Sequence, residues 1–322
     1  MGAMRRLGVS FLWAVTVAGL PAAGSLGTAL AAPAIADPLP TSPAVAAMLD
    51  DGADGRFDGH TLLAAALLAS GVSSPDLPSY GAAYQRWHRS LVEQTGHQST
   101  VYPRARAVHE FIHRRILHSY DPRATRLDVA IDRGLYNCVS ATLLFSCLAR
   151  DLGLNTETIG LPGHAVSVVL DGVERLEIET TCPNWFDLPA EARRRAIGRR
   201  AGGTIESPSI QPSPLHGRIL GPAELVAVMY YNQGVDHLER REFAQAVSSN
   251  LRALRLDPGS AAARGNLLAS INNWALALCE AGQFHEALEK LDEGLLIDPA
   301  HAPLIANQQH VRRTWARTSA LP

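Results

Sequence analysis

The chain changes its sequence period near Gly153, and this change limits the folds that it can adopt. Residues 137–152 are apolar on most faces, which predicts a buried helix that ends at this glycine. Residues 156–161, 164–170 and 174–180 are short, contain β-branched residues and are bounded by turn residues, which predicts three strands. Helices beside a small antiparallel sheet indicate the α+β class.

The last two predicted strands form a hairpin that brings two ionisable side chains together. Asp-Gly at 171–172, between two β-rich runs, is a strong signal for a two-residue turn. If Leu170 pairs with Val173, His164 lies opposite Glu179 on the same face of the sheet. Such a carboxylate orients the imidazole and stabilises its charged form. The alternative is a solvated cross-strand pair without a function, and a register slip of one residue would separate the two.

Cys138 lies at the predicted start of the buried helix. Asn137 before it is a favoured N-cap residue, which places the thiol in the first turn. The partial positive charge of a helix N-terminus lowers a thiol pKa, and the free Cys138 N–H can bind an oxyanion. Most buried cysteines are inert, and Cys147, half a turn out of phase, is predicted to be a core residue. Together, Cys138, His164 and Glu179 have the residue types of a nucleophile, a base and an orienting acid.

Four motifs in this order resemble the core of the transglutaminase-like superfamily. They are Cys138-x-x-Ala141, the apolar helix, Gly163-His164-Ala and Leu176-Glu-Ile-Glu179-Thr-Thr. The resemblance covers about residues 101–187 and implies a papain-like fold with no cofactor. It also implies thioester chemistry, in which Cys138 attacks an amide, His164 transfers the proton and Glu179 orients His164.

The chain departs from the family pattern at two points. The acid is Glu179 where the family usually has Asp, and no upstream Gln or Trp stands out as an oxyanion donor. Two residues are candidates for contacts with the oxyanion or the substrate. They are Asn137, which precedes Cys138, and Trp185, which follows the Glu179 strand closely. Asp187 is a second candidate for the orienting acid.

One further motif predicts a different chemistry. His109-Glu110-Phe111-Ile112-His113 matches the HExxH zinc signature, in which two histidines share a helix face and the glutamate acts as base. No third ligand follows at a recognisable spacing, so no metal is expected and a zinc hydrolase is the lesser alternative. Without a metal, His109 and His113 are expected on a polar helix face.

The last hundred residues contain two similar units that resemble tetratricopeptide repeats. Small residues recur where two helices would cross closely, and each unit ends in an apolar residue followed by Asp-Pro, at 256–258 and 297–299. Two repeats are too few for independent stability, so the module is expected to pack on the core. It serves either as a surface for a peptide or protein partner or as structural support.

Residues 1–36 have the features of a secretory signal. A basic pair at 5–6 precedes an apolar run at 7–20, and small-x-small sites follow at 29–31 and 34–36. We therefore expect an exported protein, periplasmic or extracellular, and anchored if the signal is not cleaved. No second segment of the sequence is long and apolar enough to span a bilayer, so no other membrane contact is expected.

The remaining organisation follows from composition. Residues 37–100 are expected to be a loose lead-in, mostly over 37–55, followed by helices, the first at 60–70 and 80–94. A helix at 103–118 begins the catalytic core, 101–188. A Ser/Pro-rich linker or surface loop, 189–222, precedes the repeat module, 223–322.

Charge and cysteine content exclude some functions. A formal net charge of −2 gives no electrostatic footprint for nucleic acid. Among the four cysteines, Cys147–Cys182 is the one pair considered for a disulfide. The sequence thus predicts an exported cysteine-dependent enzyme that acts on amide bonds of proteins or peptides, by hydrolysis or acyl transfer. An inert interaction scaffold that uses the repeats is the alternative.

Overall fold

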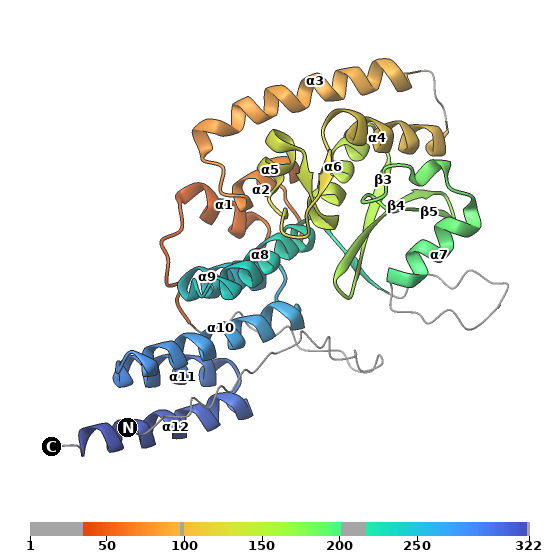
Figure 1. The fold of residues 1–322 in the computed structure, drawn as a ribbon. Helices are drawn as coiled ribbons and strands as arrows, with labels where there is room; N and C mark the ends of the chain where they lie inside the picture. Colours follow the sequence, from red (N-terminus) through yellow and green to blue (C-terminus); the bar gives the residue numbers. More distant parts are fainter. Residues whose placement is uncertain (1–34, 97–99, 201–216, 321–322) are drawn as a thin grey trace, which may run out of the picture.

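A computed structural model of the chain describes residues 35–96, 100–200 and 217–320 (Figure 1). The apolar run of the expected signal and the Ser/Pro-rich stretch lie outside the described residues. In the part of the chain that is described, no helix is both long and apolar enough to cross a membrane.

Within the described residues, five α-helices and one short 3-10 helix come before Cys138, and all three helices expected there are present. They are α1 (Pro43–Asp51), α2 (Leu62–Ala69), η1 (Ser74–Asp76), α3 (Leu77–Thr95), α4 (Val101–Arg115) and α5 (Leu127–Arg133).

The loose lead-in expected over 37–55 is wrong, because α1 lies within it. Ser42 caps this helix by accepting a hydrogen bond from the Val45 N–H at 3.3 Å, and Pro43 occupies its first turn. Met48 and Leu49 are fully buried in the main core. Burial of these two side chains stabilises a helix whose composition alone resembles a loop.

A four-stranded antiparallel sheet in the order β5-β4-β3-β6 lies beside helix α6 (Cys138–Asp151), which makes the fold α+β. The strands are β3 (Asn155–Leu161), β4 (His164–Asp171), β5 (Glu174–Ile178) and β6 (Arg218–Leu220). Two short parallel strands, β1 (Ser119–Tyr120) and β2 (Leu135–Tyr136), pair directly before α6. Helix α6 therefore begins at a point fixed by strand pairing and continues across β3 and β4.

The hairpin register differs from the prediction by two residues. Asp171 pairs with Glu174, so the loop consists of Gly172 and Val173. Gly172 has a φ of 61° in the first central position, where a type II′ turn requires a positive φ. Because side chains alternate with a period of two, this shift keeps every side chain on its predicted face. Strand β5 also ends at residue 178, so Glu179 follows the strand.

The segment expected to be a linker contains ordered elements. Helix α7 (Ala190–Arg200) occupies its start, and β6 at its end pairs with β3 as the outer strand of the sheet. No strand was expected here, because β6 has only three residues and depends on β3 for its hydrogen bonds.

The C-terminal region consists of two helix pairs and a final helix, which Figure 1 shows in successive layers. They are α8 (Pro222–Glu239), α9 (Phe243–Leu256), α10 (Ala261–Glu280), α11 (Phe284–Ile297) and α12 (Ala302–Ser319). A Cβ on Gly234 would lie 2.5 Å from Asn250 Nδ2, and one on Gly294 would lie 2.7 Å from Leu304 Cδ1. The glycines thus permit the close helix crossings that the sequence pattern predicted.

The first helix pair is part of the main hydrophobic core, as expected for a module that cannot stand alone. Residues of α8, α9 and α10 belong to the same buried cluster as α2, α6 and the sheet. Arg218 on β6 donates two hydrogen bonds to Asp257, at 2.7 and 2.8 Å, and the Asp257 side chain is 6% exposed. This ion pair joins the edge of the sheet to the end of α9.

We expect Asp257→Asn to lower the free energy of unfolding by about 1 kcal/mol, because it removes the charge of a nearly buried carboxylate whose partner, Arg218, is 44% exposed. Asp298→Asn is the matched control, since Asp298 ends the second helix pair at the same position and its side chain accepts from the Ala300 N–H. Urea denaturation at constant m-value measures both. Equal losses in the two variants would contradict a special role for Arg218.

Candidate active site

The start of α6 is fixed by a reciprocal cap. Asn137 is extended, and its Oδ1 accepts from the N–H groups of Val139 and Ser140 at 2.9 and 3.1 Å. In return, the Ser140 hydroxyl accepts from the Asn137 N–H at 3.0 Å. This cap makes Cys138 the first residue of the helix, as predicted.

The Asn137 side chain has no donor left for a substrate. Its Nδ2 donates to the Pro122 carbonyl at 3.1 Å and to the Thr125 hydroxyl at 2.7 Å, and the residue is 2% exposed. The expectation that Asn137 contacts an oxyanion is therefore wrong, because both amide hydrogens hold the neighbouring loop.

His164 and Glu179 are in direct contact. The imidazole Nε2 lies 2.6 Å from Glu179 Oε2, and the two side chains are 7% and 2% exposed. The other carboxylate oxygen accepts from the Thr181 N–H at 3.0 Å and from its hydroxyl at 2.5 Å. These bonds fix the plane of the carboxylate and aim one oxygen at the imidazole.

Cys138 is the second group that acts on the imidazole. Its thiol is within hydrogen-bonding reach of His164, and because Nε2 faces Glu179, Nδ1 is the nitrogen left for the sulfur. Burial lowers the pKa of His164, but the hydrogen bonds to Cys138 and Glu179 outweigh burial and raise this pKa to about 9. The three predicted residues therefore meet in one chain of contacts, which favours a charged imidazole beside the thiol.

The same contacts act on the carboxylate. Burial alone raises the pKa of Glu179, but the hydrogen bonds and charge of His164 and the bonds from Thr181 hold it below its usual value. Glu179 is thus ionised at neutral pH although it is almost fully buried.

The Cys138 backbone N–H is a free donor at the site. Among the described residues no hydrogen bond to it is found, whereas the next two N–H groups of α6 are capped by Asn137. It lies at the positive end of a 14-residue helix. An oxygen that gains negative charge beside the thiol can therefore be stabilised by this N–H.

Trp185 and Asp187 lie in the short helix η2 (Trp185–Asp187) and do not have the roles considered for them. Trp185 is 1% exposed, and its Nε1 donates to the Glu177 carbonyl at 3.0 Å, so it is a core residue that does not line a cleft. Asp187 is exposed and accepts a 2.7 Å hydrogen bond from Arg106. Glu179 alone among the considered acids contacts His164.

None of the four cysteines forms a disulfide among the described residues, so the candidate bridge Cys147–Cys182 is absent. Cys147 is buried between Tyr84 and Asp151, and burial raises its thiol pKa to about 12, which fits the core role predicted for it. Cys182 lies 3.6 Å from Asn184 Oδ1, in the turn after Glu179.

The two histidines of the HExxH motif point inward, and the expectation of a polar helix face is wrong. His109 is 0% exposed, and His113 Nε2 lies 3.0 Å from the Thr180 carbonyl. Glu110 points outward and pairs with Arg106 and Arg114. Within the described residues, no group of three or more His, Cys, Asp or Glu side chains is placed to hold a metal ion.

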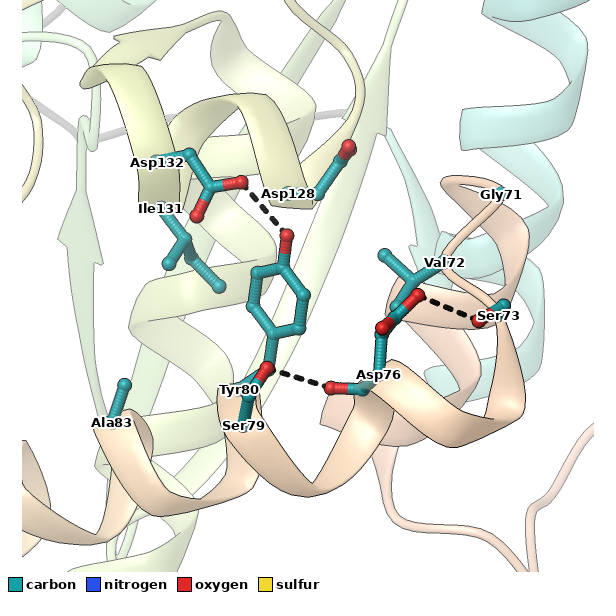
Figure 2. A pocket seen from close by; sticks show the side chains of 10 residues that line it. All are labelled: Gly71, Val72, Ser73, Asp76, Ser79, Tyr80, Ala83, Asp128, Ile131 and Asp132. Carbon is teal, nitrogen blue, oxygen red and sulfur yellow. Dashed lines mark hydrogen bonds between the residues drawn. The ribbon is translucent and has the colours of Figure 1, made fainter.

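A separate acidic pocket of about 470 Å³ lies between α3 and α5 (Figure 2). Tyr80 donates to Asp132 at 2.7 Å inside it, and this bond raises the pKa of the phenol to about 12. None of the three candidate catalytic residues lines this pocket, so it has no part in the site at Cys138.

Sequence reasoning missed the residues that support Glu179. Thr181 donates to its carboxylate, and the Thr142 and Thr180 hydroxyls lie 3.0 Å apart in the core. The polar pair Thr180-Thr181 in an apolar setting, together with the HExxH histidines at helical spacing, was the signal that could have found them.

Comparisons of the chain with protein-family models, with curated proteins and with solved structures found no match. A function for this protein therefore has to be inferred from the geometry of the site.

We expect Glu179→Gln to lower the pKa of His164 from about 9 toward its ordinary value near 6.5, because the carboxylate charge is removed. Since the folded-state pKa lies above the unfolded one, this histidine stabilises the protein below pH 6.5, and that stabilisation is lost as pH rises through 9. NMR titration of the imidazole measures the shift. Asp187→Asn is the control and should leave the titration unchanged; an unchanged titration in Glu179→Gln would contradict the contact.

The buried pair His109 and His113 leads to a separate prediction about stability at acidic pH. Burial lowers their pKa values to about 3 and about 4, so the unfolded chain binds protons that the folded chain does not. The contribution of this pair to stability should be constant above about pH 6.5 and fall below it, by roughly 4 kcal/mol between pH 7 and pH 5, whereas the contribution of His164 changes between about pH 6.5 and 9. Urea unfolding at several pH values measures this.

The matched variants for that experiment are His109→Leu and His285→Leu, because His285 is exposed on α11. The first should remove roughly half of the acid sensitivity, and the second should leave it unchanged. An equal pH dependence in wild type and His109→Leu would refute the assignment.

Proposed function

We propose that this protein is an exported, cysteine-dependent enzyme that acts on amide bonds of proteins or peptides. Cys138, His164 and Glu179 would act as nucleophile, base and orienting acid in a transglutaminase-like core of papain-like fold. The observation that carries this proposal is the chain of contacts from the Glu179 carboxylate, through the imidazole at 2.6 Å, to the Cys138 thiol.

The first half of the reaction is acyl transfer to sulfur. His164 holds the thiol proton, and the Cys138 thiolate attacks the amide carbonyl carbon to form a C–S bond. The carbonyl oxygen becomes an oxyanion, which the Cys138 N–H and the start of α6 stabilise. The intermediate collapses by breaking the C–N bond, and the imidazolium protonates the departing amine. A thioester remains on Cys138.

The second half regenerates the thiol. Neutral His164 removes a proton from a water molecule or an amine, which attacks the thioester carbonyl. Breakage of the C–S bond then releases an acid or a new amide, and the sulfur recovers the proton from the imidazolium. Glu179 stays ionised throughout and stabilises each imidazolium. We favour hydrolysis, because a water molecule reaches this nearly buried site more easily than a larger amine does.

The C-terminal helix pairs are proposed to be tetratricopeptide repeats that support the core and accept a protein partner. Their support of the core follows from the shared hydrophobic cluster and the Arg218–Asp257 ion pair. The basic and apolar N-terminal sequence supports export to the periplasm or the cell exterior.

One observation favours the alternative of an inert scaffold. Cys138 is 8% exposed and the His164 side chain is 7% exposed, so both reacting groups lie nearly out of solvent. An enzyme with this site must admit its substrate carbonyl by a small movement of the surrounding side chains. Direct measurement of thiol reactivity separates the two functions.

We expect Cys138 to react with iodoacetamide with a pH midpoint well below the unperturbed thiol pKa of about 8.5. The experiment uses a Cys182→Ser, Cys279→Ser background, in which Cys147 is buried and unreactive. His164→Ala and Glu179→Ala should both raise the midpoint, because each removes part of the ion pair. A Cys138 that reacts no faster than Cys279 of the parent chain, whatever the residue at 164 or 179, would establish the scaffold.

A further inference from the structure

The carboxylate of Glu179 belongs to a turn that is held from two sides. Glu179 follows the last residue of β5, and the Cys182 N–H donates to its carbonyl at 3.1 Å, which closes the turn. Thr180, the next residue, is 0% exposed. Strand β5 ends before Glu179 and does not fix it by strand pairing. The position of the carboxylate therefore depends on the contacts that fix Thr180.

Two helices bind Thr180 from different directions. The His113 Nε2 of α4 lies 3.0 Å from the Thr180 carbonyl, and the Thr142 hydroxyl of α6 lies 3.0 Å from the Thr180 hydroxyl. A carbonyl only accepts hydrogen bonds, so the proton of neutral His113 is on Nε2. The other nitrogen, Nδ1, is buried without a partner among the described residues.

His109 lies one helical turn before His113 and packs against it. The two rings have centroids 4.7 Å apart, and His109 also contacts Phe186 at 5.3 Å. The Glu179 and Cys182 carbonyls lie beside the His109 ring, but neither makes a hydrogen bond of ordinary geometry with it. A buried polar ring that lacks a full set of partners costs stability, so packing alone does not account for it.

Both histidines of this pair are uncharged at neutral pH, which is compatible with a hydrogen-bond donor beside Glu179. Burial holds the pKa of His109 at about 3 and that of His113 at about 4, so both rings are neutral at pH 7. The other titratable groups around the two rings are Tyr136 on β2, which contacts His113, and Glu179 and Cys182 on the turn, which lie beside His109. A neutral donor can hold the turn without competing with His164 for the negative charge of Glu179.

We propose that His113, backed by His109, is a positioning residue that fixes Thr180 and thereby holds the Glu179 carboxylate against His164. This inference rests on the proposed cysteine-dependent reaction. It assigns to the HExxH histidines a structural task in that reaction in place of metal binding.

The test compares two variants at the same position. Glutamine can place an N–H near the position of Nε2 and still donate to the Thr180 carbonyl, whereas leucine fills similar space and leaves the carbonyl unsatisfied. The readout is the pH midpoint of Cys138 alkylation by iodoacetamide in the Cys182→Ser, Cys279→Ser background. Thermal melting checks folding, and His285→Leu is the control for loss of an exposed histidine.

The expected result is that His113→Leu raises the alkylation midpoint by about one pH unit, which is tenfold less thiolate below the midpoint. His113→Gln should keep the wild-type midpoint. A folded His113→Leu protein with the wild-type midpoint overturns the positioning role and leaves the proposed enzyme intact. A wild-type chain without a lowered midpoint overturns the proposed function itself.

A second pair of variants applies if His113→Leu does not fold. Thr142→Val removes the hydroxyl that binds Thr180 from α6, and Thr142→Ser keeps it. The valine variant should raise the alkylation midpoint and the serine variant should not. Equal midpoints in the two folded variants overturn the role of Thr180 as the anchor of Glu179.

Discussion

The hydrogen bonds of the Asn137 side chain are the contacts on which the rest of the candidate site depends. Its oxygen caps α6 and so makes Cys138 the first helical residue, while its nitrogen binds the loop at Pro122 and Thr125. The same loop contacts the C-terminal helices, because Asn232 of α8 lies 3.4 Å from the Thr125 hydroxyl. One buried amide thus joins the candidate nucleophile, the preceding loop and the first helix pair. Removing it would leave two helical N–H groups and the Pro122 carbonyl without these partners at once.

The second constraint is the burial of a charge. The Glu179 side chain is 2% exposed, so its ionised form must receive full hydrogen bonding from the protein. His164 supplies this on one oxygen and Thr181 on the other. The turn that carries Glu179 and Thr181 is held by hydrogen bonds from α4 and α6 to Thr180. Helices far apart in the sequence therefore determine the geometry of a single carboxylate, which explains why the catalytic-type residues alone could not indicate how they are held.

Local sequence signals predicted the parts of the site that depend on local physics. Asn137 was recognised as a cap, and the faces of His164 and Glu179 were correct although the register was two residues off, because a shift of two preserves side-chain alternation. The failures depend on tertiary contacts. The burial of His109, the bond from Trp185 to the Glu177 carbonyl and the pairing of β6 with β3 arise between segments that no local pattern relates.

The energetics of the buried His164–Glu179 pair bear on whether the site is functional. A buried ion pair contributes little net stability, because desolvation of both groups offsets their attraction, and apolar side chains of similar volume often stabilise a core better. The fold therefore gains no clear stability from a charged imidazole beside a nearly buried carboxylate. A thiol at a capped helix start, with an unused N–H next to it, adds a second feature that stability does not require. The proposed chemistry at Cys138 would give a common reason for both, since each lowers the energy of a negative charge that forms on sulfur or on a substrate oxygen.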